Sequence, residues 1–573
     1  MRPTLDFHPA LLEALRGYNA SRLKQDVTAG IVVGIVALPL AIAFGIASGV
    51  NPSIGLVTAI IGGFLVSALG GNSVQIGGPT GAFIVIVYNI IQQFGLTGLA
   101  LATFMAGCIL ILLGLFRLGT VIKFIPYPIV VGFTAGIALT IFSTQIPDLL
   151  GLSIQEKIPG DFISKWGVYF RNAASIDWAT VLVSAATLMI IIAVPKISRR
   201  LPATLIAIVA VTFGCWLVGD IFGLIHVDTI GDRFGAMATN IPAPHSLHID
   251  IATINLLLPS AFTIAMLGAI ESLLSATVAD GVTGARTNCN TELIGQGVAN
   301  AVVPLFGGIP VTGAIARTMT NITSGGRTPV AGVVHAAVLL LIFFFAMPVI
   351  NMVPMSCLAA VLVMVAYNMS GWRTIRGILH NPKGDIWVLA VTFVLTVVFD
   401  LTIAIEIGLL LAVVVFLRRV MENTTVKVYG RQLDATDGTD ASTHEVLDLA
   451  PGVSVYEIDG PFFFGAATKF DEMMRVSPHE RPYVRIIRMR KVPFIDATGI
   501  HNLEILIRSS HEEGIKIVLS GVQEQVHEAL RKAGIESMIP DANICDHISK
   551  AVRVANALAA ERMELRPGMT TGI

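Results

Sequence analysis

The sequence has little charge for its length. Only 13% of its 573 residues are charged, whereas 54% are apolar, and the mean hydropathy is +0.76. A soluble enzyme has about 25% charged residues, so this composition indicates a protein that lies largely in a membrane. The 38 basic and 39 acidic side chains nearly cancel to a net charge of -1. This balance argues against a nucleic-acid partner, which a strongly basic surface would recruit.

Signals for metal binding, disulfide bonding and secretion are also missing. The chain has 5 cysteines, with no CxxC pair and no histidine at metal-ligand spacing. We therefore expect neither a metal site nor a disulfide framework, and no cofactor. The first 26 residues are polar and mildly amphipathic, without the apolar core and the cleavage site of a signal peptide. The N-terminus is expected to stay in the cytoplasm.

The charge that is present concentrates near the C-terminus. Residues 441–573 hold 33 of the 77 charged side chains, a density typical of a soluble domain. The expected organisation is a cytoplasmic N-terminal segment, a transmembrane domain, a polar linker, a soluble domain and a tail. Their expected boundaries are 1–26, 27–420, 421–442, 443–560 and 561–573.

Apolar runs alternate with short breaks rich in Gly, Pro or charge throughout the transmembrane domain. About 20 apolar residues are needed to cross the hydrocarbon core as a helix, and several runs are shorter or fused. We predict fourteen segments. They lie near 27–47, 54–70, 79–93, 97–116, 126–146, 177–195, 202–224, 253–277, 290–306, 312–323, 329–347, 354–368, 384–400 and 401–417.

Basic residues fall mainly in alternate breaks between these segments, and the opposite breaks are mostly uncharged or mixed. By the positive-inside rule, the basic breaks face the cytoplasm. An even number of segments then places both termini on that side. The basic residues include Arg117, Lys196, Arg286, Arg327, Arg373, Arg376, Lys383, Arg418 and Arg419.

Two stretches, 77–83 and 307–314, differ from ordinary spanning helices. Each has a Gly-Gly pair, then a proline, then small and hydroxyl residues that open a short apolar segment. Irregular backbone at membrane depth is tolerated only when it is buried in protein or lines a wet cavity. Matched interruptions in two halves of a chain are a sequence signal for the central site of a transporter.

The chemistry of these stretches favours an anion. Pro79 and Pro310 suit the start of a helix, and the free N–H groups that follow present the positive end of the helix dipole. Two such ends facing each other would bind negative charge. The order of the segments also predicts that the two halves have opposite orientations. The alternative is that these glycines only allow close helix packing.

Ionisable residues within the apolar segments mark further candidates. Glu271 is expected to be the only acid in a membrane helix of the second half before the last two segments. A carboxylate there should be protonated, paired or facing water, and each state could couple transport to an ion. Ser275 lies one turn further along the same face. Arg317, just inside the second short helix, could neutralise a substrate anion or Glu271, or it could be purely structural.

Four stretches of this sequence resemble the SulP family of anion transporters, and the similarity covers nearly the whole chain. The residues that carry it are Leu38-Pro39-Leu40-Ala41-Ile42-Ala43-Phe44, Gly78-Pro79-Thr80-Gly81-Ala82-Phe83, Leu267-Gly268-Ala269-Ile270-Glu271-Ser272-Leu273-Leu274, and Ala316-Arg317-Thr318 with Gly325-Gly326-Arg327. Within the family, the chain looks most like the bacterial members that carry C4-dicarboxylates by proton symport.

This resemblance implies two inverted repeats of seven segments, a core domain with the site, a gate domain, elevator-like movement and a homodimer. Sodium-dependent bicarbonate carriers of the family have Asp and Thr where this chain has Glu271 and Ser275, and proton-coupled members have Glu. Carried over by position, the coupling residues would be Glu271 and Ser275. The substrate-binding residues would be Ala43, Phe44, Thr80, Gly81, Phe83, Gly313, Ala314, Ile315 and Arg317.

The C-terminal domain shows short apolar strands alternating with amphipathic helices, typical of an α/β sandwich. We expect strands at 453–458, 484–489 and 515–519, and helices at 467–476, 499–513 and 522–533. The turn at 495–500 resembles the Asp-x-Ser/Thr-Gly turn of STAS domains, in which Thr498 matches a phosphoacceptor and Asp496 precedes it. Alternatively, the Thr498 hydroxyl only caps the helix.

The basic run of this domain, formed by Arg485, Arg488, Arg490 and Lys491, is expected to be solvated strand surface or a contact with the membrane domain. A regulatory protein of the cytoplasm could bind the STAS-like domain. No phosphate-binding loop or catalytic triad is present in the sequence, so we do not expect an enzyme.

The hypothesis that follows is a secondary active anion transporter of the bacterial inner membrane, taking up C4-dicarboxylates such as fumarate or succinate with protons. A sodium-coupled bicarbonate or sulfate transporter is the first alternative. An anion channel and a membrane-anchored sensor that signals through its STAS domain are alternatives of another class.

Overall fold

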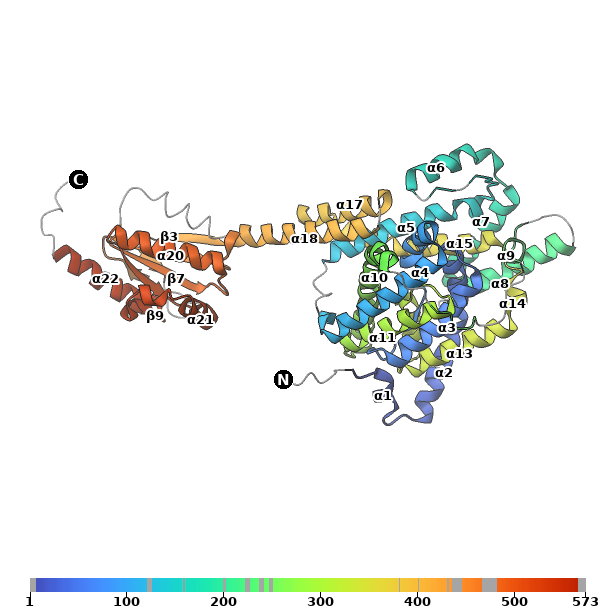
Figure 1. The fold of residues 1–573 in the computed structure, drawn as a ribbon, viewed down its shortest axis with the longest axis horizontal. Helices are drawn as coiled ribbons and strands as arrows, with labels where there is room; N and C mark the ends of the chain where they lie inside the picture. Colours follow the sequence, from blue (N-terminus) through green and yellow to red (C-terminus); the bar gives the residue numbers. More distant parts are fainter. Residues whose placement is uncertain are drawn as a thin grey trace. The chain divides into compact units, whose positions relative to one another are not determined.

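The structure is a computed structural model of the chain, and it forms two compact units, 1–412 and 413–573. Helix α18 runs from the first unit into the second (Figure 1). The residues that the structure describes are 7–120, 126–156, 158–159, 161–198, 202–221, 227–235, 242–246, 251–380, 382–399, 401–429, 432–434, 446–465 and 482–564.

The first unit is almost entirely helical. The elements of its first half are α1 (Ala10–Leu15), α2 (Ala20–Ala47), α3 (Pro52–Leu69), strand β1 (Gly77–Gly78), η1 (Gly81–Phe83), α4 (Ile84–Leu115), α5 (Tyr127–Leu150), α6 (Phe162–Arg171), η3 (Ala173–Ser175), α7 (Trp178–Ile197), α8 (Ala203–Cys215), η4 (Trp216–Ile221) and α9 (Ile230–Phe234).

The second half of this unit repeats much of that order. Its elements are α10 (Ile251–Thr283), α11 (Cys289–Val302), η5 (Val303–Phe306), strand β2 (Thr312–Gly313), α12 (Ile315–Thr323), α13 (Val330–Phe345), α14 (Met347–Ile350), α15 (Met355–Met369), α16 (Trp372–Ile378), α17 (Lys383–Val398) and α18 (Leu401–Asn423).

Within the described ranges, each of the fourteen predicted segments lies mainly on helical structure. Among the described residues, 7 helices are long and apolar enough to cross a membrane, and 81–115 counts as one of them. That helix contains two predicted segments, 79–93 and 97–116, which are divided at Gly95. Its φ of 70° and ψ of -174° interrupt the helical backbone. A left-handed φ is readily adopted by glycine, so the sequence places the kink there.

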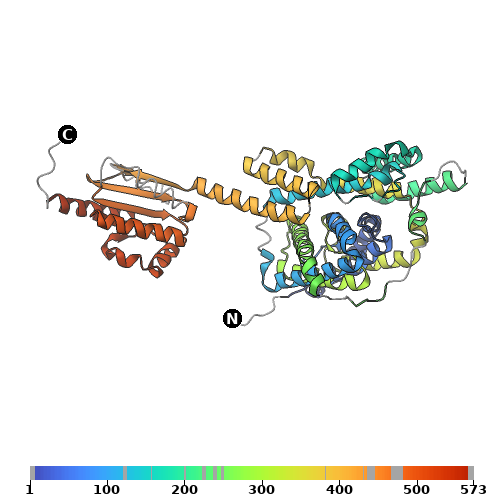
Figure 2. The same cartoon turned by 45° about the horizontal axis from the view of Figure 1, so that its top comes forward.

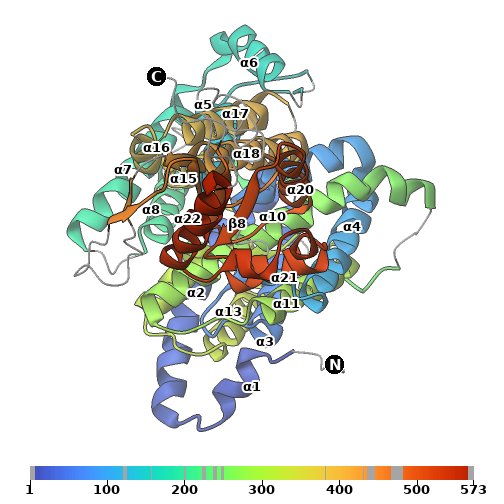
Figure 3. The same ribbon diagram turned by 90° about the vertical axis from the view of Figure 1, so that its left-hand side faces the viewer.

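Packing contacts in this unit occur in matched pairs. Helix α2 packs on α13, and its counterpart α10 packs on α4. Likewise α3 packs on α13 and α11 on α4, while α5 packs on α17 and α15 on α7. Figures 1 and 3 show α2 beside α13 and α10 beside α4. Such exchange of equivalent contacts is what two interlocked repeats produce, as predicted from the order of the segments.

These contacts also divide the helices of the unit into two groups. Helices α2, α3, α4 and α10 to α13 pack mainly on one another, whereas α5, α7, α8, α15 and α17 form the other group. We call the first the core group and the second the gate group.

The expected N-terminal segment 1–26 overlaps the membrane helix, because α2 already begins at Ala20, where the Asn19 side chain caps its N-terminus.

The second unit contains a five-stranded sheet in the order β3-β6-β7-β8-β9 (Figure 2). Strand β3 is antiparallel to β6, and the other pairs are parallel. Helices α20 and α21 pack on one face and α22 on the other. The elements are β3 (Thr425–Tyr429), β4 (Gln432–Asp434), β5 (Val446–Asp448), β6 (Val453–Asp459), β7 (Val484–Lys491), α20 (Ala497–Glu512), β8 (Lys516–Ser520), α21 (Glu524–Lys532), η6 (Glu536–Met538), η7 (Asp541–Asn543), β9 (Ile544–Cys545) and α22 (Ile548–Glu564).

Two boundaries expected from the sequence overlap elements of the second unit. The expected linker 421–442 includes β3, which is an edge strand of the sheet, because its alternating side chains let it pair along β6. The expected tail at 561–573 overlaps the end of α22 at Glu564. The helix expected at 467–476 lies outside the described residues.

Candidate functional site

The two broken stretches of the sequence meet inside the core group. Strands β1 and β2 pair antiparallel, with Gly77 opposite Gly313 and Gly78 opposite Thr312. The pairing continues one residue further, since the Ala314 N–H donates to the carbonyl oxygen of Ile76 at 2.9 Å. The antiparallel arrangement is what two repeats of opposite orientation require.

A short helix begins directly after each strand. Helix η1 follows β1 and continues into α4, and α12 follows β2. Neither helix start has a hydrogen bond from the side chain of its N-cap residue, Thr80 or Ala314. The first N–H groups of a helix have no partner within that helix, so both starts present donors and the positive end of a dipole.

Close backbone approach at this crossing explains the glycines. A Cβ atom at Gly313 would lie 1.4 Å from Nε2 of Gln75, so no larger residue fits there. Gln75 is buried and donates to the hydroxyl of Ser272 in α10 at 2.9 Å. The crossing is thereby tied to the helix that carries Glu271.

The hydroxyl of Thr80 faces Glu271 instead of capping its own helix. Thr80 Oγ1 donates to Oε2 of Glu271 at 2.9 Å. Thr80 is buried, while Glu271 is half-buried although it lies midway along α10. The acid of one repeat therefore contacts the start of the short helix of the other repeat.

Arg317 lies in the first turn of α12 and is buried at 2% exposure. Its guanidinium donates to the carbonyl oxygens of Gly77, at 3.3 Å, and Pro79. Within the described part of the chain, it forms no ion pair with Glu271. Two of its N–H groups are thus bonded to backbone carbonyls of the other repeat. The charges of Arg317 and Glu271 interact without direct contact, so the suggestion that Arg317 neutralises Glu271 stays a prediction.

Of the other predicted residues, three are apolar and line the core, and Ser275 is polar and contacts α12. Ala43, Phe44 and Phe83 are buried apolar side chains of the same core cluster, and Gly268 of α10 lies against Phe83. Ser275 does not join Glu271. Its hydroxyl donates to Thr318 of α12 at 3.4 Å, and it is 1% exposed.

Gly81 and its neighbours connect the crossing to the gate group. A Cβ atom at Gly81 would lie 2.9 Å from Sδ of Met369 and 3.3 Å from Cδ1 of Ile141. Met369 belongs to α15 and Ile141 to α5, and both helices are in the gate group. The start of α4 thus lies where core and gate helices meet. On the opposing side, Ala314 is the N-cap of α12 and Ile315 is its first residue.

Sequence reasoning missed a second buried acid. Glu292 of α11 is fully buried, and so the expectation that Glu271 stands alone is wrong. Its Oε2 accepts from the N–H groups of Gly71 at 2.8 Å and Asn72 at 3.1 Å. Its Oε1 accepts from Ser272 at 3.1 Å and Gln296 at 2.9 Å. The sequence contained a signal for this buried acid, because Glu292 is a charged residue within the predicted apolar segment 290–306.

The two acids differ in their environment. Four donors satisfy the carboxyl oxygens of Glu292, as a buried polar group requires. Glu271 receives one hydrogen bond, from Thr80, and is partly accessible. Glu271 is thus the acid with fewer hydrogen-bond donors around its carboxyl group.

In the second unit, Asp496 caps α20. Its Oδ1 accepts from the N–H of Gly499 at 2.7 Å, and its Oδ2 accepts from the N–H of Phe464 at 3.2 Å. Thr498 lies in the first turn of α20 with an exposed side chain. The suggestion that the Thr498 hydroxyl caps this helix is therefore wrong, since Asp496 occupies the cap position.

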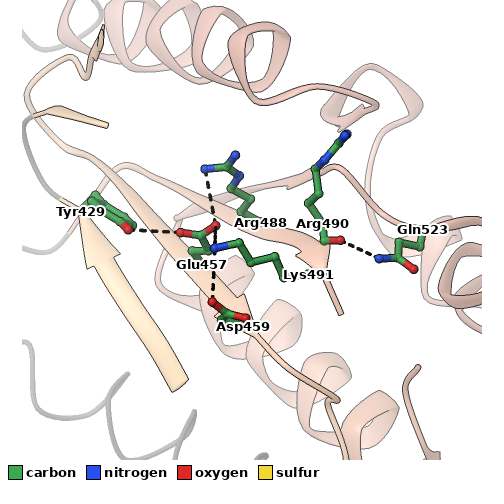
Figure 4. A network of polar contacts seen from close by, with 7 residues as sticks. All are labelled: Tyr429, Glu457, Asp459, Arg488, Arg490, Lys491 and Gln523. Atoms are coloured by element: carbon green, nitrogen blue, oxygen red, sulfur yellow. Dashed lines mark hydrogen bonds and ion pairs between the residues drawn. The ribbon is translucent and has the colours of Figure 1, made fainter. Parts of the chain in front are cut away.

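The basic run of this unit is not uniformly solvated. Arg488 is 4% exposed, and its Nη1 lies 3.5 Å from Oε1 of the buried Glu457 (Figure 4). Tyr429 donates to Oε2 of Glu457 at 3.1 Å. Lys491 contacts Asp459 at 3.2 Å and Glu457 at 3.6 Å, and these carboxylates, Asp459 first, raise the pKa of Lys491. This polar cluster joins β3 to β6 and β7.

The fold and the crossing define a class: a multi-pass helical membrane protein with two opposed half-helices near its centre and an α/β domain after them. The model of the sulfate permease family matches residues 23–392, and the model of the STAS domain matches 446–551. The chain belongs to the sulfate permease family and carries a STAS domain. Members of this family are anion transporters, not enzymes.

Two curated relatives show the extent of this similarity. The chain is 40% identical over 534 residues to "Putative sulfate transporter YvdB" of Bacillus subtilis, covering 93% of this chain and 98% of that protein. It is 30% identical over 551 residues to "Bicarbonate transporter BicA" of Synechocystis, covering 93% and 94%.

Two solved structures share the fold. That of SLC26A9 has a TM-score of 0.83 at 18% identity, covering 97% of this chain and 94% of that chain. The transmembrane domain of a cyanobacterial BicA has a TM-score of 0.60 at 29% identity, covering 69% and 98%. The expected helical membrane fold with a C-terminal STAS domain is confirmed.

Proposed function

We propose that this chain is a proton-coupled anion transporter in which Glu271 carries the proton and the substrate is a C4-dicarboxylate such as fumarate or succinate. The observation that carries the proposal is the environment of Glu271: a half-buried acid with one hydrogen-bond donor, Thr80, at a helix start. A carboxyl at membrane depth that is neither ion-paired nor fully hydrogen-bonded can exchange a proton during transport.

The proposed binding site lies between the starts of α4 and α12. Its donors are the N–H group of Gly81 on one side and those of Ile315 and Arg317 on the other, next to the fixed positive charge of Arg317. Helix starts of this kind favour anions. Ala43, Phe44 and the Phe83 ring supply apolar walls.

We further propose an elevator-like movement of the core group against the gate group, because Gly81 lies at their boundary. The proposed setting is the bacterial inner membrane, with the N-terminus and the STAS domain in the cytoplasm and the chain as a homodimer. A cytoplasmic regulatory protein could act on the turn at Asp496 and Thr498, since the Thr498 side chain is exposed.

The test is uptake into proteoliposomes that contain the purified full chain. With an inward proton gradient and no sodium, labelled succinate or fumarate should accumulate, and Glu271→Gln should abolish the dependence on pH. Glu406→Gln is the matched control, because Glu406 is an exposed acid of α18. It should keep the pH dependence. Uptake that ignores pH in the unmodified chain would contradict the proposal.

Sulfate or bicarbonate transport is the second candidate function. The names of the relatives favour it, because YvdB and BicA are named for sulfate and bicarbonate. A competition panel separates the candidates: unlabelled sulfate, bicarbonate or fumarate is added in excess to each labelled anion. Sodium-dependent bicarbonate uptake that fumarate does not inhibit would replace the dicarboxylate proposal.

A further inference from the structure

Helix α6 is a short amphipathic helix that packs on the gate helix α5. The side chain of Asp161 caps it by accepting from the N–H of Ser164 at 2.8 Å. Ile163 and Phe170 are exposed, whereas Lys165 and Tyr169 point inward and are buried. A lysine on the inward face is unusual, because lysine is almost never fully buried unless it is paired.

The partner of Lys165 is an aromatic ring of the core helix α4. Its Nζ lies 5.9 Å from the centroid of the Tyr88 ring, and its exposure is 3%. In the described part of the chain, Lys165 forms no ion pair with a carboxylate. Burial lowers the pKa of this ammonium, while the charge of Asp161 opposes that effect. A desolvated ammonium near a tyrosine ring within about 6 Å is a cation–π contact.

The contact joins the core group to α6, which packs on the gate helices α5 and α17, near the proposed binding site. Tyr88 belongs to α4, the helix that begins next to Thr80 and Phe83, and Lys165 belongs to α6. Tyr88 follows Phe83 by little more than one turn of helix. A movement of the core group against the gate group must therefore stretch or break this contact.

The membrane face on which the contact lies follows from the ends of α2 and α3. A Cβ atom at Gly49, just past the end of α2, would lie 3.3 Å from the Tyr88 ring. At the other end of α3, the N–H of Ala10 donates to the carbonyl oxygen of Gly70. Tyr88 and Lys165 are thus near the membrane face opposite to the N-terminal segment.

We propose that Lys165 and Tyr88 form a latch that closes the binding site toward the face opposite to the N-terminus. In the latched state, the ammonium is held against the ring and α6 is held against α4. When the core group moves, the ammonium is released into the opening, where it attracts the entering anion. Both are positioning residues for transport, and the latch depends on anion transport but not on the identity of the anion.

The experiment measures access to the site in the full chain, reconstituted in vesicles, after its five cysteines have been replaced. A single reporter, Phe83→Cys, is labelled from the face opposite to the N-terminus by a membrane-impermeant thiol reagent. Tyr88→Leu removes the ring and keeps the charge of Lys165, so the labelling rate should rise about tenfold. Tyr88→Phe keeps the ring and should leave the rate unchanged. This comparison needs no substrate, so it stands apart from the test of proton coupling.

Lys165→Met provides the second arm, and Lys383→Met is its control, because Lys383 is an exposed lysine. Lys165→Met should also raise the labelling rate from that face, whereas Lys383→Met should not. The melting temperature of each variant in detergent shows whether it is folded. Equal labelling of Tyr88→Leu and Tyr88→Phe would overturn the latch, and so would a fall in melting temperature with unchanged labelling.

Discussion

The Thr80 hydroxyl donates a hydrogen bond to Glu271 at 2.9 Å, and so joins residues that are 191 positions apart in the chain. Threonine at a helix start usually accepts a hydrogen bond from its own helix, but no such bond is present at Thr80. The hydroxyl thereby ties the acid of the second repeat to the first short helix. A change in the charge of Glu271 therefore alters a hydrogen bond at the start of α4.

Thr80→Val is expected to lower uptake because the carboxyl of Glu271 loses this donor. A hydrogen bond to a charged group contributes about 1.5–3 kcal/mol, so the rate at saturating substrate should fall by about tenfold or more. Thr80→Ser keeps the hydroxyl and should retain most of the uptake. Initial rates in proteoliposomes test this, and equal rates for the Val and Ser variants would contradict it.

Arg317→Lys is expected to impair transport although the charge is kept. The guanidinium reaches the carbonyl oxygens of both Gly77 and Pro79, and a lysine ammonium cannot reproduce this planar fork. Loss of the bridge should disorder the β1–β2 crossing and lower both uptake and the melting temperature in detergent. If the Lys variant transports like the unmodified chain, only the charge of Arg317 matters.

Glu292→Gln is expected to destabilise the chain, whereas Glu271→Gln is not. An amide at position 292 can accept through only one of its two atoms, so donors such as the Gly71 N–H lose their partner. An unsatisfied buried donor costs about 1–3 kcal/mol. Melting temperatures of the two variants in the same detergent test this contrast. A larger fall for Glu271→Gln would reverse the structural and coupling roles given to these acids.

Asp496→Ala is expected to destabilise the STAS domain by about 0.5–2 kcal/mol, the usual cost of losing an N-cap. Its carboxylate accepts from Gly499 and also from Phe464. Thr498→Ala removes an exposed side chain and should change stability by no more than about 0.5 kcal/mol. Thermal unfolding of the full chain, followed by a probe on the STAS domain, separates the two. Equal losses would show that Thr498 is also structural.

The latch between Lys165 and Tyr88 could not be read from the sequence. Lys165 lies in a long polar break, where a lysine is ordinarily solvated, and Tyr88 is one apolar residue among many in its segment. Only the packing of α6 shows that the lysine is buried against the ring. The same holds for Arg488, a strand residue whose partner Glu457 is on the neighbouring strand.

The sequence by itself determined the membrane fold, the place of each apolar segment, the two broken stretches and the α/β domain. These features depend on local properties of the sequence: hydrophobic runs, the positions of glycine and proline, and the alternation of strands and helices. The structure has elements at the places that these properties predict. The tertiary structure decided which polar groups meet. Thr80 donates to Glu271, Arg317 donates to the carbonyl oxygen of Gly77, and Ser275 donates to Thr318. The first two pairs join different repeats, and the third joins two helices of the second repeat, so only the packing of the folded chain brings these groups within hydrogen-bond distance.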